Sequence, residues 1–113
     1  MSDETTELWI HKIRKLAEPI KQAEYQILVC DADIKKLQAQ LKTTALANGN
    51  KTVASQEVYA ENNPSLYKAR LRHAIAKSEL SALKVELKAL EVGFEEWRTK
   101  MVNQREEKKF YGA

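Results

Sequence analysis

The sequence contains few residues that interrupt a helix or cross-link a chain. Its 113 residues include one cysteine, two prolines and three glycines, and aromatic residues make up 7%. The single thiol, Cys30, cannot form an intrachain disulfide and favours a reducing, cytoplasmic setting. The longest apolar run is ILVC at residues 27–30, whereas a membrane span needs about 20 apolar residues. The acidic, polar start MSDETTELW argues against a signal peptide, so we expect no membrane association.

The residue patterns that enzymes and metal sites need are also scarce. His11 and His73 do not lie at ligand spacing to a second histidine or to the cysteine, which makes a zinc site improbable. The glycines are isolated, so no phosphate-binding loop is present. Paired carboxylates lie among Lys and Arg, as they do on a solvated helix face. We therefore expect no catalytic residue, no metal site and no cofactor.

Residues that favour long helices are abundant. Charged residues make up 31% of the chain, and Ala, Leu, Glu, Lys and Gln are its dominant residue types, a composition typical of long helices. Apolar residues in the first half follow one another at alternating steps of four and three, which keeps them on one side of a helix. This first seam consists of Trp9, Ile13, Leu16, Ile20, Ala23, Ile27, Cys30, Ile34, Leu37 and Leu41.

The first seam predicts one helix over about residues 4–47. Pro19 lies within it and disfavours a continuous interior, because its ring removes a hydrogen bond and clashes with the preceding turn. The heptad phase continues through Pro19, which leaves open whether the helix kinks there or a new helix begins. Gly49 between two asparagines ends the helix and predicts a break at residues 48–52.

Two further helices are expected after this break. A short one covers residues 53–61, and a long one runs over about residues 64–108, with Asn63 as its N-cap and Pro64 at its first position. Its apolar seam is Leu66, Ala69, His73, Ala76, Leu80, Leu83, Leu87, Leu90, Phe94, Trp97 and Met101. The predicted fold of residues 1–113 is a single all-α domain, an antiparallel helical hairpin or coiled coil of two long helices with a short connecting helix.

A second apolar stripe accompanies the seam of the last helix. It runs through Tyr67, Leu71, Ala74, Ser78, Val85 and Val92 and is more apolar surface than a two-helix seam needs. A two-helix hairpin buries little apolar area by itself, so this second stripe favours a homo-oligomer or a protein partner. The expected contact residues are Tyr67, Leu71, Val85 and Val92, together with Phe110 and Tyr111 near the C-terminus.

The start of the last helix is basic and free of acidic residues. Residues 62–77 carry four Lys and Arg side chains and no carboxylate. In an antiparallel hairpin residues 66–77 face roughly residues 33–44, which offer Asp33 and little other negative charge. Basic side chains beside flat rings suit single-stranded nucleic acid, since phosphates need cations and bases need a stacking surface. The candidate contacts are Lys68, Arg70, Arg72 and Lys77, with Tyr67 and Tyr59 as stacking residues; a solvated helix face remains the alternative.

The segment YKARLRHAIAKSEL, followed by a long Leu-rich helix and a basic, aromatic ending, resembles small phage recombination mediators of the UvsY type, known from T-even phages. Its tetrapeptide KARL is similar to the basic motif with which that family binds single-stranded DNA, which implies strand contact by Lys68 and Arg70. The resemblance implies a ring-like homo-oligomer without catalytic activity. Such a protein loads a recombinase onto strands covered by a single-strand-binding protein, in the host cytoplasm if it is phage-encoded.

A second function class fits the same sequence. The even charge mixing of the first helix and the aromatic pair Phe110–Tyr111 also suit a helical protein-binding module, such as an adaptor, an assembly chaperone or an inhibitor of a host defence complex. In that case the basic segment would cover a nucleic-acid-facing surface of the partner.

Overall fold

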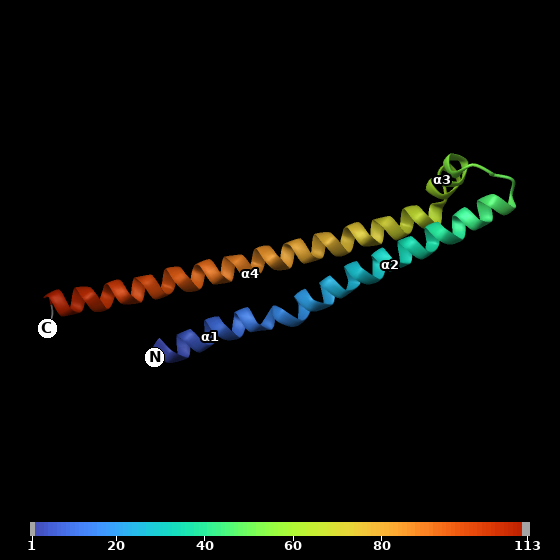
Figure 1. The fold of residues 1–113 in the computed structure, drawn as a ribbon. Helices are drawn as coiled ribbons and strands as arrows, with labels where there is room; N and C mark the ends of the chain where they lie inside the picture. The colour runs from blue at the N-terminus through green and yellow to red at the C-terminus, as the bar shows by residue number, and fades with distance from the viewer. Residues whose placement is uncertain (1, 112–113) are drawn as a thin grey trace. The chain divides into compact units, whose positions relative to one another are not determined.

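A computed structural model describes residues 2–111, with side chains from residue 4, and these residues form four helices and no strand (Figure 1). The helices are α1 at Ser2–Lys15, α2 at Ala17–Ala47, α3 at Val53–Glu61 and α4 at Pro64–Tyr111. The all-α class is confirmed, as are two long helical stretches with a short helix between them. The short helix has the predicted bounds, and α4 extends three residues past the predicted end at residue 108.

The first long helix is divided at Leu16, which lies upstream of Pro19. The Leu16 amide donates to the carbonyl of Ile13 over 3.1 Å, a tighter turn than in an α-helix, and α2 begins at Ala17. Pro19 is therefore the third residue of α2. Amides in the first turn of a helix have no intrahelical partner, so the missing N–H of proline costs no helical hydrogen bond there. The structure thus selects a new helix start over a kink.

Both predicted seams face inward. Every residue of the first seam, from Trp9 to Leu41, and every residue of the α4 seam, from Leu66 to Met101, is buried or half-buried. The members of the second stripe, by contrast, are all exposed. The heptad spacing therefore identified the packed side of each helix correctly.

The chain forms two compact units, to both of which α2 and α4 contribute. Unit one consists of residues up to Ile20 and from Ser81 onward, and it pairs α1 with the C-terminal part of α4. Trp9 of α1 contacts Phe94 of α4 in this unit, with ring centroids 6.2 Å apart. Gly93 leaves room for the indole, because a Cβ at that position would lie 3.0 Å from the Trp9 ring.

Unit two, residues 21–80, contains α3 together with most of α2 and the beginning of α4. Leu41, Ala60 and Leu66 form its buried cluster, one from each helix, and Leu66 is 1% exposed. Ile34, Leu37 and Tyr59 pack against this cluster. The small side chain of Ala60 lets the backbone of α3 approach the other two helices closely.

Local capping chemistry sets the ends of these helices. After α2, the amide of Asn50 donates to the Ala45 carbonyl and the amide of Gly49 to the Leu46 carbonyl, with Gly49 at φ 94°. These two bonds are those of a Schellman motif, which needs a left-handed residue and therefore favours glycine. The Thr52 side chain accepts from the Ser55 amide at the start of α3.

Candidate nucleic-acid interface

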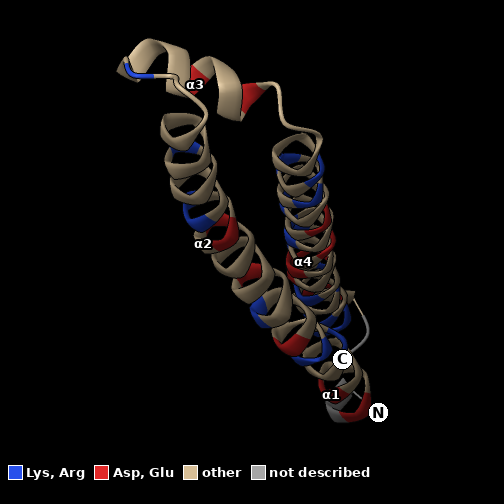
Figure 2. Cartoon of the chain, turned by 90° about the vertical axis from the view of Figure 1, so that its right-hand side faces the viewer, with Lys and Arg blue, Asp and Glu red and all other residues tan. Residues whose placement is uncertain are grey.

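The positive charge of the protein is unevenly distributed between the two units. Unit two contains nine Lys and Arg against six Asp and Glu, whereas the remaining residues contain ten of each. The whole formal net charge of +3 therefore belongs to unit two. Figure 2 shows acidic residues alternating with basic ones along much of the helices.

The four predicted cations form what we call the basic band: Lys68, Arg70, Arg72 and Lys77. All four are exposed on the first turns of α4. Lys68 and Arg72 are four residues apart and share one side of the helix, while Arg70 and Lys77 are seven apart and share another. The band therefore covers two sides of the helix rather than a single line.

Arg70 has a carboxylate partner, which contradicts the expectation of an unneutralised basic segment. Both terminal nitrogens of its guanidinium donate to Glu61 of α3, and the Nη2–Oε1 distance is 2.7 Å. The Arg70 and Glu61 side chains remain 43% and 51% exposed. The facing segment of the first long helix, residues 33–44, offers Asp33 alone, whereas Glu61 comes from the last turn of α3. The turn through Asn62 and Asn63 places it beside Arg70.

The ion pair shifts the pKa of both partners. Hydrogen bonds from Arg70 lower the pKa of Glu61 below its ordinary value, although slight desolvation opposes this, and the positive charges of Arg70 and Lys42 act in the same direction. The hydrogen bond to Glu61 raises the pKa of Arg70. Glu61 is thus a carboxylate at neutral pH, and Lys42 of α2 lies within electrostatic range of it.

The other three cations of the band have no such partner. Among residues 4–111, whose side chains the structure describes, no ion pair involves Lys68, Arg72 or Lys77. On α2, Lys35 contacts Asp31 at 3.1 Å, and Lys36 is exposed. Lys68, Arg72 and Lys77 are therefore the cations of α4 in unit two that remain available to a polyanion.

The two tyrosines proposed for stacking differ in accessibility. Tyr67, which belongs to the second stripe and directly precedes Lys68 in the sequence, is 68% exposed. Tyr59 is half-buried against the Leu41–Ala60–Leu66 cluster, and its hydroxyl accepts a hydrogen bond from the Asn48 amide group at 3.4 Å. We therefore retain Tyr67 as a stacking candidate and assign Tyr59 to packing.

The exposed apolar surface beside the basic band is larger than the second stripe indicated. Ile75 is half exposed and lies four residues after Leu71, which itself lies four residues after Tyr67. The predicted stripe did not include Ile75. Its spacing from Leu71 was the signal that could have identified it, because residues four apart share a helix side.

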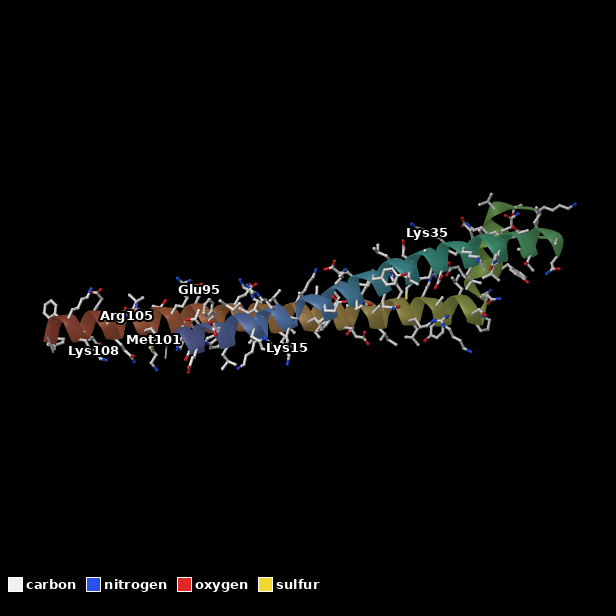
Figure 3. All side chains as sticks on the ribbon, turned by 90° about the horizontal axis from the view of Figure 1, so that it is seen from below. Lys15, Lys35, Glu95, Met101, Arg105 and Lys108 are labelled. Carbon is white, nitrogen blue, oxygen red and sulfur yellow. The ribbon has the colours of Figure 1, made fainter. Side chains whose placement is uncertain are left out.

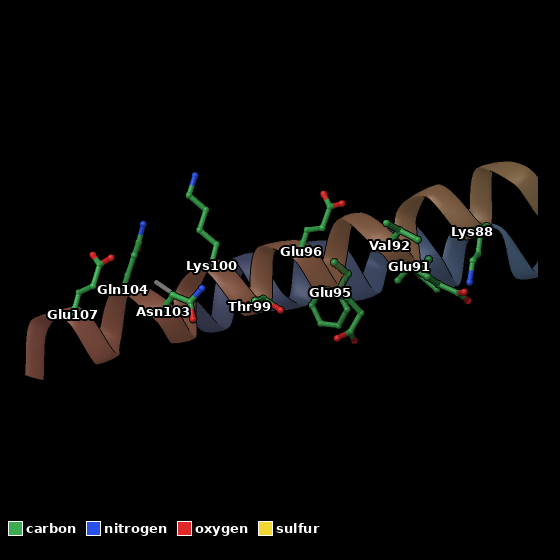
Figure 4. A pocket seen from close by; sticks show the side chains of 12 residues that line it. Lys88, Glu91, Val92, Glu95, Glu96, Thr99, Lys100, Asn103, Gln104 and Glu107 are labelled. Carbon is green, nitrogen blue, oxygen red and sulfur yellow. The ribbon is translucent and has the colours of Figure 1, made fainter. Parts of the chain in front are cut away.

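Unit one has a different surface feature, an open groove along α4 with a volume of about 950 Å³ (Figure 4). Apolar atoms of Ile13, Val92 and Phe94 lie along it, and most of the other lining side chains are charged or amides. Further along α4, Arg105 and Lys108 project from the last turns (Figure 3). Phe110 and Tyr111 are each 84% exposed and contact one another, with ring centroids 5.3 Å apart.

Comparisons of the chain with protein-family models, with curated proteins and with solved structures gave no match. Within residues 2–111, none of the helices combines the length and apolar composition that crossing a membrane requires. In the same part of the chain, no three metal-ligating side chains come together.

Proposed function

We propose that this protein is a non-enzymatic, cytoplasmic binder of single-stranded DNA that acts as a phage-type recombination mediator. The observation that supports this most directly is the set of exposed, unpaired cations Lys68, Arg72 and Lys77 in the unit that carries the whole net charge. Bringing like charges together is unfavourable by itself, and a polyanion relieves this repulsion while releasing its own counterions.

In this proposal the strand runs along the first turns of α4. Lys68 and Arg72 bind phosphates on one side of the helix, Lys77 binds a phosphate on the side that it shares with Arg70 as the strand passes around α4, and the exposed ring of Tyr67 stacks on an unpaired base. The resemblance to UvsY-type mediators adds the physiological role, which is the loading of a recombinase onto strands covered by a single-strand-binding protein. Neither role requires a reacting group on the mediator.

Self-association is part of the same proposal. Tyr67, Leu71, Val85 and Val92 are exposed on α4, as are Phe110 and Tyr111 at its end. Their side chains lie away from the packed seam, and burying them requires a surface from another molecule. We propose that this surface is supplied by further copies of the chain, as the mediator resemblance implies. Light scattering that gives a monomer mass at micromolar concentration would contradict this part.

Fluorescence anisotropy with a labelled oligonucleotide tests the central proposal. Three phosphate contacts on a single strand predict a slope of about −2 in log K against log salt, so affinity should fall about 20-fold between 50 and 200 mM salt. The triple variant K68Q/R72Q/K77Q should lose about 50-fold in affinity at 0.15 M salt. Removing three cations near the other end of α4, in R105Q/K108Q/K109Q, is the matched control and should have little effect. Absence of binding by the wild type at 50 mM salt would refute the proposal.

A helical protein-binding module is the second candidate, and the exposed Phe110–Tyr111 pair favours it. Rings of this size near a basic helix end are typical anchors at protein interfaces. An adaptor, an assembly chaperone or an inhibitor of a host defence complex would use them in this way. Two results together would favour this function over the first. The wild-type protein would not bind oligonucleotides, and it would form a stoichiometric complex with one purified partner. That complex would survive nuclease treatment and be lost in F110A/Y111A.

A further inference from the structure

We propose that Arg70 is a phosphate site already occupied by an internal carboxylate, so that Glu61 competes with the DNA strand for the Arg70 guanidinium. This inference rests on the proposed function and adds a regulatory group to it. The supporting observation is the two-point contact between the Arg70 fork and both Glu61 oxygens, across two different helices.

The geometry of the pair is that of an anion site. A guanidinium binds a carboxylate and a phosphate in the same manner, with two parallel N–H donors directed at two oxygens. Glu61 presents its two oxygens to Arg70 as a phosphodiester would present its two non-bridging oxygens. Lys42 lies in electrostatic range of the same carboxylate, so a phosphate there would meet a second cation.

The pair can exchange partners without unfolding α3. Both side chains are about half exposed, so water and ions reach them and the carboxylate is not locked in place. The helix itself is held by Ala60, which is 2% exposed in the cluster with Leu41 and Leu66, and by the Thr52 cap. When a phosphate takes the guanidinium, Glu61 moves into solvent by side-chain rotation while α3 stays packed.

Competition of this kind limits the binding of short anions, such as mononucleotides and free phosphate, to Arg70. A short anion must displace Glu61 for a single contact, whereas a strand held by Lys68, Arg72 and Lys77 presents its next phosphate at high local concentration. Arg70 therefore contributes once the strand is already bound. The internal carboxylate favours long strands over mononucleotides and free phosphate.

The test is a double-mutant cycle with a labelled oligonucleotide in 0.15 M salt. Glu61→Gln removes the competitor and should tighten binding about fourfold, the effect of one additional phosphate contact at that salt concentration. Glu57→Gln is the matched control, since it removes the same charge from an exposed position one turn earlier on α3. In an Arg70→Gln background, E61Q should have no more effect than E57Q has.

The outcomes separate this inference from the proposed function. Equal gains for E61Q and E57Q, or an E61Q gain that persists in the R70Q background, would overturn the competition and leave strand binding in place. Failure of the wild type and of all variants to bind at 50 mM salt would overturn both. Circular dichroism of each variant checks that helicity is unchanged.

Discussion

Replacement of Leu66 by alanine tests whether one small cluster holds the three helices of unit two together. Leu66 is 1% exposed and lies against Leu41 and Ala60, so the substitution removes buried methyl groups and leaves a cavity between α2, α3 and α4. Leucine-to-alanine changes at such sites cost about 3 kcal/mol, with a spread that depends on how far the surroundings collapse. Because the cluster is small, we expect a loss of about 3 kcal/mol and not a larger one.

The assay is urea denaturation followed by circular dichroism at 222 nm, at one fixed protein concentration. With a denaturant dependence of about 1.5 kcal/mol per molar urea, the midpoint should fall by about 2 M. Leu28→Ala is the matched control, because Leu28 is 68% exposed on α2 and outside the proposed contacts. It should change the unfolding free energy by less than about 0.5 kcal/mol. Similar midpoints for the two variants would refute the assignment of Leu66 to the core.

Three further predictions concern the turn, the cap and the ion pair. Gly49→Ala places a Cβ at φ 94°, where nothing crowds it, so only backbone strain of about 1 kcal/mol should appear as a lower melting temperature; an unchanged melting temperature would contradict the Schellman motif. Thr52→Ala removes the N-cap of α3 and should cost about 1 kcal/mol in the same measurement, whereas equal stability would mean that the cap contributes nothing. Because the folded pKa of Glu61 is lowered, the stabilisation from its ion pair is present above the ordinary carboxylate pKa and is lost as the pH falls through the folded pKa. The stability difference between wild type and E61Q should therefore shrink between pH 7 and pH 3, and a difference independent of pH would contradict the pairing.

The sequence predicted the helices well because the relevant forces act between near neighbours. The predicted bounds of α3 match the structure because the Thr52 N-cap and the Asn63–Pro64 start of the next helix are both local chemistry. The inward sides of the helices followed from periodicity, since burial of an apolar stripe dominates their packing. The division at Leu16 was not located, because proline acts on the turn before it and can be accommodated in more than one way.

The candidate site was less predictable because it depends on tertiary contacts. The charge pattern identified the basic band, and Lys68, Arg72 and Lys77 are exposed as expected. It could not show that Glu61 would reach Arg70, because that contact depends on the path of the chain between two helices. The partial burial of Tyr59 has the same origin, since the cluster against which it packs includes Leu41 of α2 and Leu66 of α4.

The break at Leu16 limits how far unwinding can spread along the chain. Helix growth and melting are cooperative because each new hydrogen bond depends on the turn before it. That continuity is interrupted where the Leu16 amide bonds to Ile13 and α2 starts afresh at Ala17. α1 can therefore fray on its own, opposed mainly by its contacts such as Trp9 against Phe94, while the backbone of α2 stays wound. Deuterium uptake should accordingly be fast in α1 and slow in the part of α2 beyond Ile20.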